Sequence, residues 1–220
     1  MGLRAVLWDM DGTLVDSEKL WDLAVEELYR QHDRVLTAQV RESTVGGSSD
    51  SLMQILYADL GLDPDATEMA RTADWVHDYV GELFETGLPW CPGAEAILAE
   101  LTAARVPTAL VTNTQRDLAE KALNSIGRQY FSVTVCGDEV PRGKPAPDPY
   151  LRAAELLGVA PGDCLAVEDS VTGSTSAQLA GCAVLVIPNA VRVPSAPRRA
   201  FAESLLGLTV ADLREIHAGL

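Results

Sequence analysis

From residue 88 onward, the sequence alternates helix patterns with short apolar runs, and this alternation limits the fold more than any other feature. The helix patterns and the runs that follow them are 93–105 with 107–112, 115–127 with 132–136, 147–158 with 163–168, and 172–181 with 183–188. Short runs rich in Val, Ala and Leu are typical of strands that are buried on both faces. With a first run at Ala5–Trp8, they predict an α/β fold in which helices cover both faces of a parallel sheet.

Residues 17–87 interrupt this alternation, because they contain helix patterns and no convincing strand. These patterns cover 17–32, 37–43, 49–60 and about 65–86. We therefore predict two domains, an α/β core made of 1–15 and 88–220 and an all-helical insert made of 16–87. Because the insert directly follows the first strand, and parallel sheets bind ligands beyond the carboxyl ends of their strands, it is expected at the edge of the site.

Composition and charge exclude several classes of partner. Hydrophobic residues make up 47% of the chain, and the net charge is −15. An acidic chain of this kind is a poor partner for nucleic acid or an anionic membrane. No apolar run approaches the roughly 20 residues needed to span a bilayer, so we expect a cytoplasmic protein, either a monomer or a homodimer. The four cysteines are far apart and favour buried thiols over a disulfide or a zinc site; they are Cys91, Cys136, Cys164 and Cys182.

Two aspartates follow the first strand. Asp9 and Asp11 stand two residues apart, and Gly12-Thr13 after them signal a turn. Residues two apart on a strand point the same way, so the two carboxylates converge. At about 4 Å they would repel by roughly 4 kcal/mol at an effective dielectric of 20, which calls for a proton or a cation between them. Oxygen ligands suit Mg²⁺. The alternative is that both residues only end a strand and cap a helix.

Other predicted strands also end in polar side chains. Thr112 and Asn113 follow one strand, and Thr114 after them is predicted to cap a helix. Glu168 and Asp169 follow another strand, and Lys144 lies in a proline-containing loop between them. Four carboxylates against one ammonium leave a charge deficit that a phosphate site cannot tolerate, and a divalent cation would balance it. Taken singly, Thr112 could be a helix cap and Lys144 a surface residue.

Four motifs resemble those of the haloacid dehalogenase superfamily of phosphatases with a helical cap. They are DMDGT at Asp9–Thr13, LVTN at Leu110–Asn113, KPAPDPY at Lys144–Tyr150 and VEDS at Val167–Ser170, in that order along the chain. The resemblance implies a Rossmann-like core with an inserted cap domain. It also implies a Mg²⁺-dependent hydrolase of phosphoric monoesters that acts on a small phosphorylated metabolite.

The resemblance also implies residue roles at the predicted site. Asp9 would be the nucleophile that forms an aspartyl-phosphate, and Asp11 would act as general acid and then general base. Asp11 would contribute only its backbone carbonyl to Mg²⁺. Asp169 would complete the metal site, and Glu168 would be an additional or water-mediated ligand.

Residues that contact the substrate follow from the same resemblance and from the insert. Lys144 would clamp the nucleophile and the phosphoryl oxygens, and Thr112 and Asn113 would bind the phosphoryl group. In the insert, Gly46-Gly47-Ser48 is a loop that could approach a ligand closely, although an ordinary turn is the alternative. The stretch DSEKLWD resembles sugar-phosphate phosphatases, whereas GDEV resembles phosphoglycolate phosphatases.

Two other functions are weighed against hydrolysis. A phosphomutase of the β-phosphoglucomutase type shares the core motifs, but that branch has a His in the first cap helix and an Arg in the cap loop. Here Trp21 stands at the first position and Ser43–Leu52 contains no Arg. A non-catalytic, phosphate-dependent or metal-dependent regulator has no use for the acid/base residue Asp11. Both alternatives are disfavoured, as is haloacid dehalogenation itself.

Overall fold

The computed structural model describes residues 2–44, 49–189 and 192–220. The chain separates into two compact units. One unit combines Met1–Asp16 with Leu88–Leu220, and the other is Ser17–Gly87. We call them the core unit and the cap unit.

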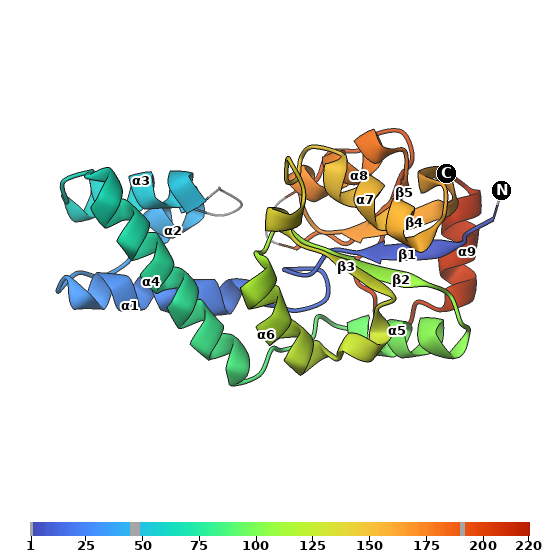
Figure 1. Cartoon of the computed structure of the whole chain (residues 1–220), viewed down its shortest axis with the longest axis horizontal. Helices are drawn as coiled ribbons and strands as arrows, with labels where there is room; N and C mark the ends of the chain where they lie inside the picture. The colour runs from blue at the N-terminus through green and yellow to red at the C-terminus, as the bar shows by residue number, and fades with distance from the viewer. Residues whose placement is uncertain (1, 45–48, 190–191) are drawn as a thin grey trace. The chain divides into compact units, whose positions relative to one another are not determined.

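The core unit is built on a six-stranded parallel sheet with the strand order β3-β2-β1-β4-β5-β6 (Figure 1). Its strands are β1 (Ala5–Trp8), β2 (Thr108–Val111), β3 (Val133–Val135), β4 (Cys164–Glu168), β5 (Ala183–Val186) and β6 (Arg199–Phe201). The first strand in sequence thus lies in the middle of the sheet, between β2 and β4. The predicted parallel sheet is confirmed, and β6 is a strand that the sequence pattern did not predict.

Helices cover both faces of this sheet, as predicted. Figure 1 shows α7 and α8 over one face and α5, α6 and α9 over the other. Their bounds are α5 (Ala94–Ala103), α6 (Arg116–Ile126), α7 (Asp148–Leu157), α8 (Val171–Ala180) and α9 (Val210–Ala218). Short 3₁₀ turns lie at Arg128–Tyr130, Gly137–Glu139 and Pro161–Asp163. The predicted α/β, Rossmann-like class is therefore confirmed.

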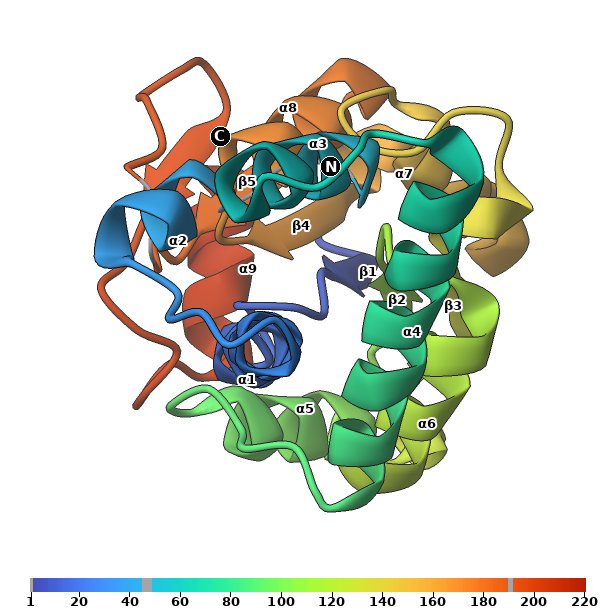
Figure 2. The same ribbon diagram turned by 90° about the vertical axis from the view of Figure 1, so that its left-hand side faces the viewer.

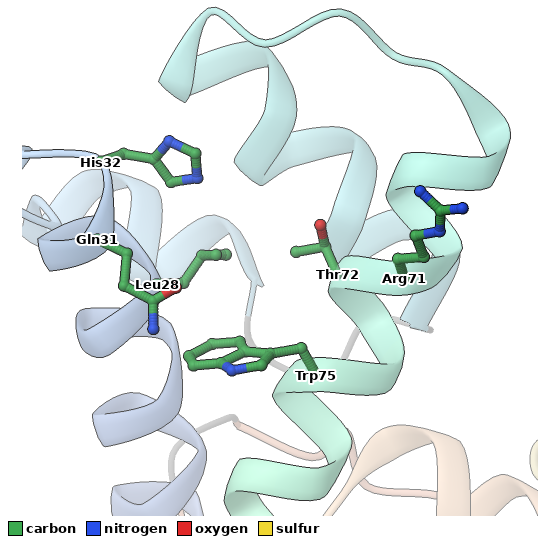
Figure 3. Close-up of a pocket in the computed structure, with 6 residues that line it drawn as sticks. All are labelled: Leu28, Gln31, His32, Arg71, Thr72 and Trp75. Carbon is green, nitrogen blue, oxygen red and sulfur yellow. The ribbon is translucent and has the colours of Figure 1, made fainter.

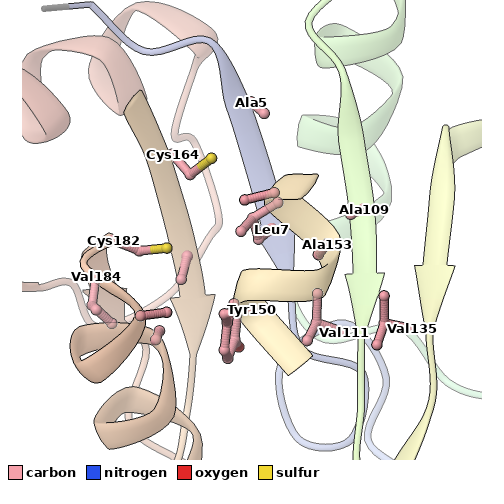
Figure 4. Close-up of a cluster of buried hydrophobic side chains, with 14 of the residues drawn as sticks. Ala5, Leu7, Ala109, Val111, Val135, Tyr150, Ala153, Cys164, Cys182 and Val184 are labelled. Carbon is pink, nitrogen blue, oxygen red and sulfur yellow. The ribbon is translucent and has the colours of Figure 1, made fainter. Parts of the chain in front are cut away.

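The strands are apolar because both of their faces are buried. Ala5 and Leu7 of β1 point into a cluster beneath α7 and α8, together with Tyr150 (Figure 4). Val6 and Trp8 alternate to the other face and are also fully buried. A strand of this kind has no solvent face on which a polar residue is tolerated. In β1, polar side chains therefore begin only with Asp9, directly after the strand.

The cap unit is all-helical within its described residues. Its helices are α1 (Glu18–Gln31), α2 (Ala38–Thr44), α3 (Ser49–Leu60) and α4 (Ala66–Glu85), each within one residue of the predicted bounds. Helix α1 packs against α4, and α3 packs against α2 and α4 (Figure 2). Asp65 caps α4 by accepting hydrogen bonds from the backbone N–H groups of Thr67 and Glu68.

A surface pocket of about 170 Å³ lies between α1 and α4 within the cap unit (Figure 3). It is lined by Leu28, Gln31, His32, Arg71, Thr72 and Trp75. None of these residues was predicted to belong to the site. Across the described part of the chain, no helix combines the length and the apolar character that a membrane span requires.

The four cysteines are thiols, as predicted, and three of them are buried. Burial raises the pKa of Cys136 and of Cys164 to about 12, and raises that of Cys182 further. These three thiols stay protonated at neutral pH. Cys91 is partly exposed.

Leu7→Ala should remove a fully buried side chain from the middle of the sheet and leave a cavity. We expect the free energy of unfolding to fall by about 2–5 kcal/mol in urea denaturation. Leu179→Ala is the control, because Leu179 is 63% exposed on α8; it should change the free energy of unfolding by less than about 0.5 kcal/mol. Equal losses for the two variants would contradict the described core.

Alkylation of the native protein at pH 8 should modify Cys91 first. The thiolate is the reactive form, so the raised pKa values of the other three thiols should slow their modification at least ~10-fold. Peptide mass spectrometry after iodoacetamide treatment measures this order. In urea all four should react alike, and rapid native labelling of Cys136 would show that it is not buried.

Candidate active site

The register of the sheet brings the ends of three strands to one level. Trp8, the last residue of β1, pairs with Leu110 of β2 on one side and with Val167 of β4 on the other. The N–H of Asp9 then donates to the carbonyl of Val167 at 3.1 Å. The residues that follow these strands therefore emerge beside one another at the carboxyl edge of the sheet, as the sequence predicted.

Asp9 lies at the centre of this edge and is only 7% exposed. Its Oδ1 accepts a hydrogen bond from Lys144 Nζ at 2.5 Å, and its Oδ2 accepts a longer one from Thr13 Oγ1 at 3.3 Å. The short, charge-assisted bond to Lys144 fixes the orientation of the carboxylate.

The turn after Asp9 requires glycine. Gly12 has φ +79°, and a Cβ placed there would lie 2.2 Å from Oδ2 of Asp169. The N–H of Leu14 donates to the carbonyl of Met10 at 2.9 Å and closes the turn. The chain thus reverses directly after the strand, and Asp169 packs against the turn where only a hydrogen atom fits.

Asp11 has surroundings different from those of Asp9. Its Oδ2 accepts hydrogen bonds from Thr114 Oγ1 at 2.7 Å and from Thr112 Oγ1 at 3.4 Å. Thr112 is buried after β2, and its hydroxyl also accepts from the N–H of Thr114 at 3.0 Å. The two threonines therefore hold the Asp11 carboxylate on the β2 side of the site.

Lys144 connects Asp9 with the end of β4. Its ammonium donates to Asp9 and, at 2.6 Å, to Glu168 Oε1, and the residue is 9% exposed. Burial alone would lower the pKa of Lys144, but the carboxylates of Asp9 and Glu168 outweigh it and hold the pKa above its ordinary value. Asn113 fixes the loop: its Oδ1 accepts from the N–H of Lys144 at 2.8 Å, and its Nδ2 donates to the carbonyl of Lys144 at 3.1 Å.

Glu168 is completely buried at the end of β4. Its Oε1 accepts from Lys144 and from the hydroxyl of Tyr150 at 2.5 Å, and its Oε2 accepts from Ser170 Oγ at 3.2 Å. Burial and the charge of Asp9 raise the pKa of Glu168, while Lys144 opposes this rise. Because both oxygens accept hydrogen bonds from the protein, Glu168 is the most constrained carboxylate of the site.

Three carboxylates could hold a cation together. Asp9, Glu168 and Asp169 each place an oxygen within 4.8 Å of the others, and they are the one such cluster found among the described residues. An all-oxygen set of carboxylates fits a hard divalent cation such as Mg²⁺. The cluster carries three carboxylates beside one ammonium, so a divalent cation would also offset the surplus negative charge.

The structure adds residues that the sequence analysis missed and leaves others outside its description. Thr114 was predicted to cap a helix, yet its hydroxyl contacts Asp11 and α6 begins after Gln115. Tyr150 and Ser170 fell within recognised motifs, but no role was predicted for them. The predicted cap residues Gly46, Gly47 and Ser48 lie outside the described residues.

Comparison with known proteins gives consistent matches. A family model described as haloacid dehalogenase-like hydrolase matches residues 3–181. A probable pseudouridine-5′-phosphatase from Drosophila melanogaster is 34% identical over 191 residues, covering 83% of this chain and 80% of that protein. Hexitol phosphatase A from Escherichia coli (strain K12) is 33% identical over 187 residues, covering 85% and 84% respectively.

A solved structure is similar along nearly the whole chain. The crystal structure of CbbY from Rhodobacter sphaeroides in complex with phosphate matches with a TM-score of 0.82 and 27% sequence identity. The match covers 96% of this chain and 99% of CbbY.

Lys144→Met should leave the buried carboxylates of Asp9 and Glu168 without their counter-charge. We expect the free energy of unfolding at pH 8 to fall by about 3–5 kcal/mol, measured by urea denaturation. Arg214→Met also removes a cation, at an exposed position of α9, and is the control; it should cost less than about 1 kcal/mol.

The loss in the free energy of unfolding caused by Lys144→Met should become smaller as the pH falls. The pKa of Glu168 is raised above its ordinary value of 4.5 in the folded protein, and loss of the ammonium raises it further. A carboxyl group of this kind favours folding below its unfolded pKa and loses that contribution as the pH rises. The variant should therefore be closer to wild type at pH 5 than at pH 8; a deficit independent of pH would contradict the described ion pair.

Proposed function

The chain belongs to the haloacid dehalogenase-like hydrolase family and is a phosphatase of that family, and we propose that it hydrolyses a small phosphorylated metabolite with Mg²⁺ through an aspartyl-phosphate. One observation carries this proposal. Asp9 is a strand-end carboxylate held by Lys144, while a second carboxylate, Asp11, is held separately by two threonine hydroxyls. Two carboxylates in different surroundings can perform two different tasks.

In the first step, an oxygen of Asp9 attacks phosphorus and the bond from phosphorus to the leaving oxygen breaks. The protonated Asp11 carboxyl gives its proton to the leaving oxygen, so the product departs as an alcohol. In the second step, water attacks phosphorus and the bond from phosphorus to the Asp9 oxygen breaks, while Asp11 takes a proton from this water and inorganic phosphate leaves. Both carboxyl groups return to their starting states.

The remaining residues position the two aspartates and offset the negative charge of the phosphoryl group. Lys144 orients Asp9 and offsets negative charge that the phosphoryl group brings to the site. Asn113 serves this step indirectly, because its amide fixes the backbone of Lys144. Thr112 was predicted to bind the phosphoryl group directly, and its contacts support a role in holding Asp11 as well.

Mg²⁺ would be held by Asp9 and Asp169, with Glu168 beside them as the third carboxylate of the cluster. When bound, it supplies positive charge for the phosphoryl oxygens. The hydrogen bonds from Lys144, Tyr150 and Ser170 to Glu168 support a water-mediated or purely electrostatic contribution from this residue.

The substrate is proposed to be a sugar phosphate or a phosphoglycolate-like metabolite. The two relatives are named as a pseudouridine-5′-phosphatase and a hexitol phosphatase, which supports a small hydroxylated phosphate monoester. Selection among such substrates is assigned to the cap unit, and Gly46-Gly47-Ser48 is its proposed contact.

Phosphate release should depend on Mg²⁺ and on Asp9. We expect release from at least one member of a panel of sugar phosphates, hexitol phosphates, nucleoside 5′-monophosphates and phosphoglycolate. Chelation with EDTA should abolish it, and added Mg²⁺ should restore it. Asp9→Asn should lower kcat by at least about 10³-fold, because the amide cannot serve as the nucleophile. The assay measures inorganic phosphate.

A matched control separates this loss from a loss of folding. Asp65→Asn makes the same chemical change at the N-cap of α4, where Asn caps as well as Asp, and should retain activity. Normal turnover by Asp9→Asn would refute the nucleophile. Isomerisation of β-glucose 1-phosphate without phosphate release would favour a phosphomutase, and no release from any substrate would favour a non-catalytic regulator.

A further inference from the structure

Tyr150 lies in the first turn of α7 and is completely buried in the cluster shown in Figure 4. A buried phenol needs a hydrogen-bond partner, and this one donates to Glu168 Oε1 at 2.5 Å. Burial and the nearby carboxylates of Glu168 and Asp9 raise the pKa of Tyr150 well above its ordinary value. The hydroxyl therefore keeps its proton and remains a donor.

Tyr150 also contacts the other member of the ion pair. Its ring centroid lies 5.2 Å from Lys144 Nζ, within the range of a cation–π contact. The hydroxyl of Tyr150 and the ammonium of Lys144 share a single acceptor, Glu168 Oε1. Tyr150, the last residue of the KPAPDPY motif, thus contacts both Lys144, which bonds Asp9, and Glu168, which bonds Lys144.

Glu168 is confined from its other side by α8. Its Oε2 accepts from Ser170 Oγ at 3.2 Å, and a Cβ at Gly173 would lie 1.9 Å from its Oε1. The carboxylate is therefore held between Tyr150 and Lys144 on one side and the first turn of α8 on the other. Within this arrangement, the hydroxyl of Tyr150 and the ammonium of Lys144 compete as donors to Oε1 of Glu168.

We infer that Tyr150 is a positioning residue for the hydrolysis: its hydroxyl holds Glu168 so that Lys144 keeps its ammonium on the nucleophile Asp9. This inference rests on the proposed function. The main role of Glu168 is then to anchor Lys144. Tyr150 affects the reaction only indirectly, through Glu168 and Lys144.

The physical reason lies in the competition for Oε1. With the phenol present, two donors share this oxygen, and Lys144 divides its own donors between Glu168 and Asp9. Without the phenol, a buried carboxylate oxygen loses a donor, and the remaining one, Lys144, is drawn toward it. The ammonium then moves away from Asp9, whose carboxylate loses the bond that orients it for attack.

Tyr150→Phe tests this directly, because it removes the hydroxyl and keeps the ring. We expect kcat to fall roughly 10- to 100-fold, as for loss of a hydrogen bond to a charged group. KM should change less than about 3-fold, because Tyr150 acts on the nucleophile and not on the substrate. A wild-type kcat in a folded Tyr150→Phe protein would overturn the inference.

Tyr29→Phe is the matched control. Tyr29 is equally buried, and its hydroxyl donates to Asp59 Oδ2 at 2.8 Å within the cap unit. This variant loses the same type of phenol–carboxylate bond and should keep its kcat. Both variants should stay folded, and the melting temperature should fall less for Tyr29→Phe, because water can reach the exposed Asp59 carboxylate but not the buried Glu168. If kcat falls equally in both, the effect of Tyr150 is merely structural and the inference is wrong.

The inference also predicts coupling between Tyr150 and Glu168. In a Glu168→Gln background, Tyr150→Phe should change kcat less than about 3-fold, because the anchored carboxylate is already gone. The full 10- to 100-fold loss in that background would mean that Tyr150 acts by another route.

A structural readout keeps this test independent of turnover. Crystal structures of the wild type and Tyr150→Phe should show the Lys144 Nζ to Asp9 Oδ1 distance lengthening from 2.5 Å to beyond hydrogen-bond range. An unchanged distance would overturn the inference even if the enzyme is a phosphatase. Lack of activity in the wild type would instead refute the proposed function, while a lengthened distance would still support the role of Tyr150.

Discussion

The ammonium of Lys144, placed between the carboxylates of Asp9 and Glu168, is the interaction on which the site depends. Three charged groups are buried together, and neither carboxylate is acceptable there without the cation. The two ion pairs of Lys144, with Asp9 and with Glu168, join the ends of β1 and β4, which the sheet register brings to one level. Asn113 at the end of β2 fixes the backbone that carries the ammonium. The central three strands thus contribute to one electrostatic unit.

This unit gives the two aspartates of one short motif different surroundings, and the proposed mechanism assigns them different tasks on that basis. Asp9 accepts a short hydrogen bond from the ammonium of Lys144, which fixes the orientation of the carboxylate that we propose as the nucleophile. Asp11 receives hydrogen bonds from the neutral hydroxyls of Thr112 and Thr114, which leaves it suited to exchange a proton. Asp11 lies in the tight turn that follows Asp9, and Asp169 packs against this turn at Gly12.

The sequence predicted the fold and the residues at the strand ends because both follow from local patterns. Buried strands are apolar along their length, so the polar residues that end them stand out. Contacts between distant segments have no such pattern. Tyr150 looks like an apolar residue of an amphipathic helix, and its bond to Glu168 arises only when α7 packs on the sheet. Thr114 resembled a helix cap, and β6, with the sequence RAF, lacks an apolar run.

In the proposed mechanism, Asp9 carries the phosphoryl group during turnover, and trapping of this phosphoenzyme in Asp11→Asn tests the step. With p-nitrophenyl phosphate, the leaving group needs no acid, so the first step proceeds while hydrolysis lacks its base. We expect a burst of p-nitrophenol equal to the enzyme concentration, with phosphate found on Asp9 by mass spectrometry after acid quenching. Unimpaired steady turnover without a burst, or phosphate on a different residue, would contradict it.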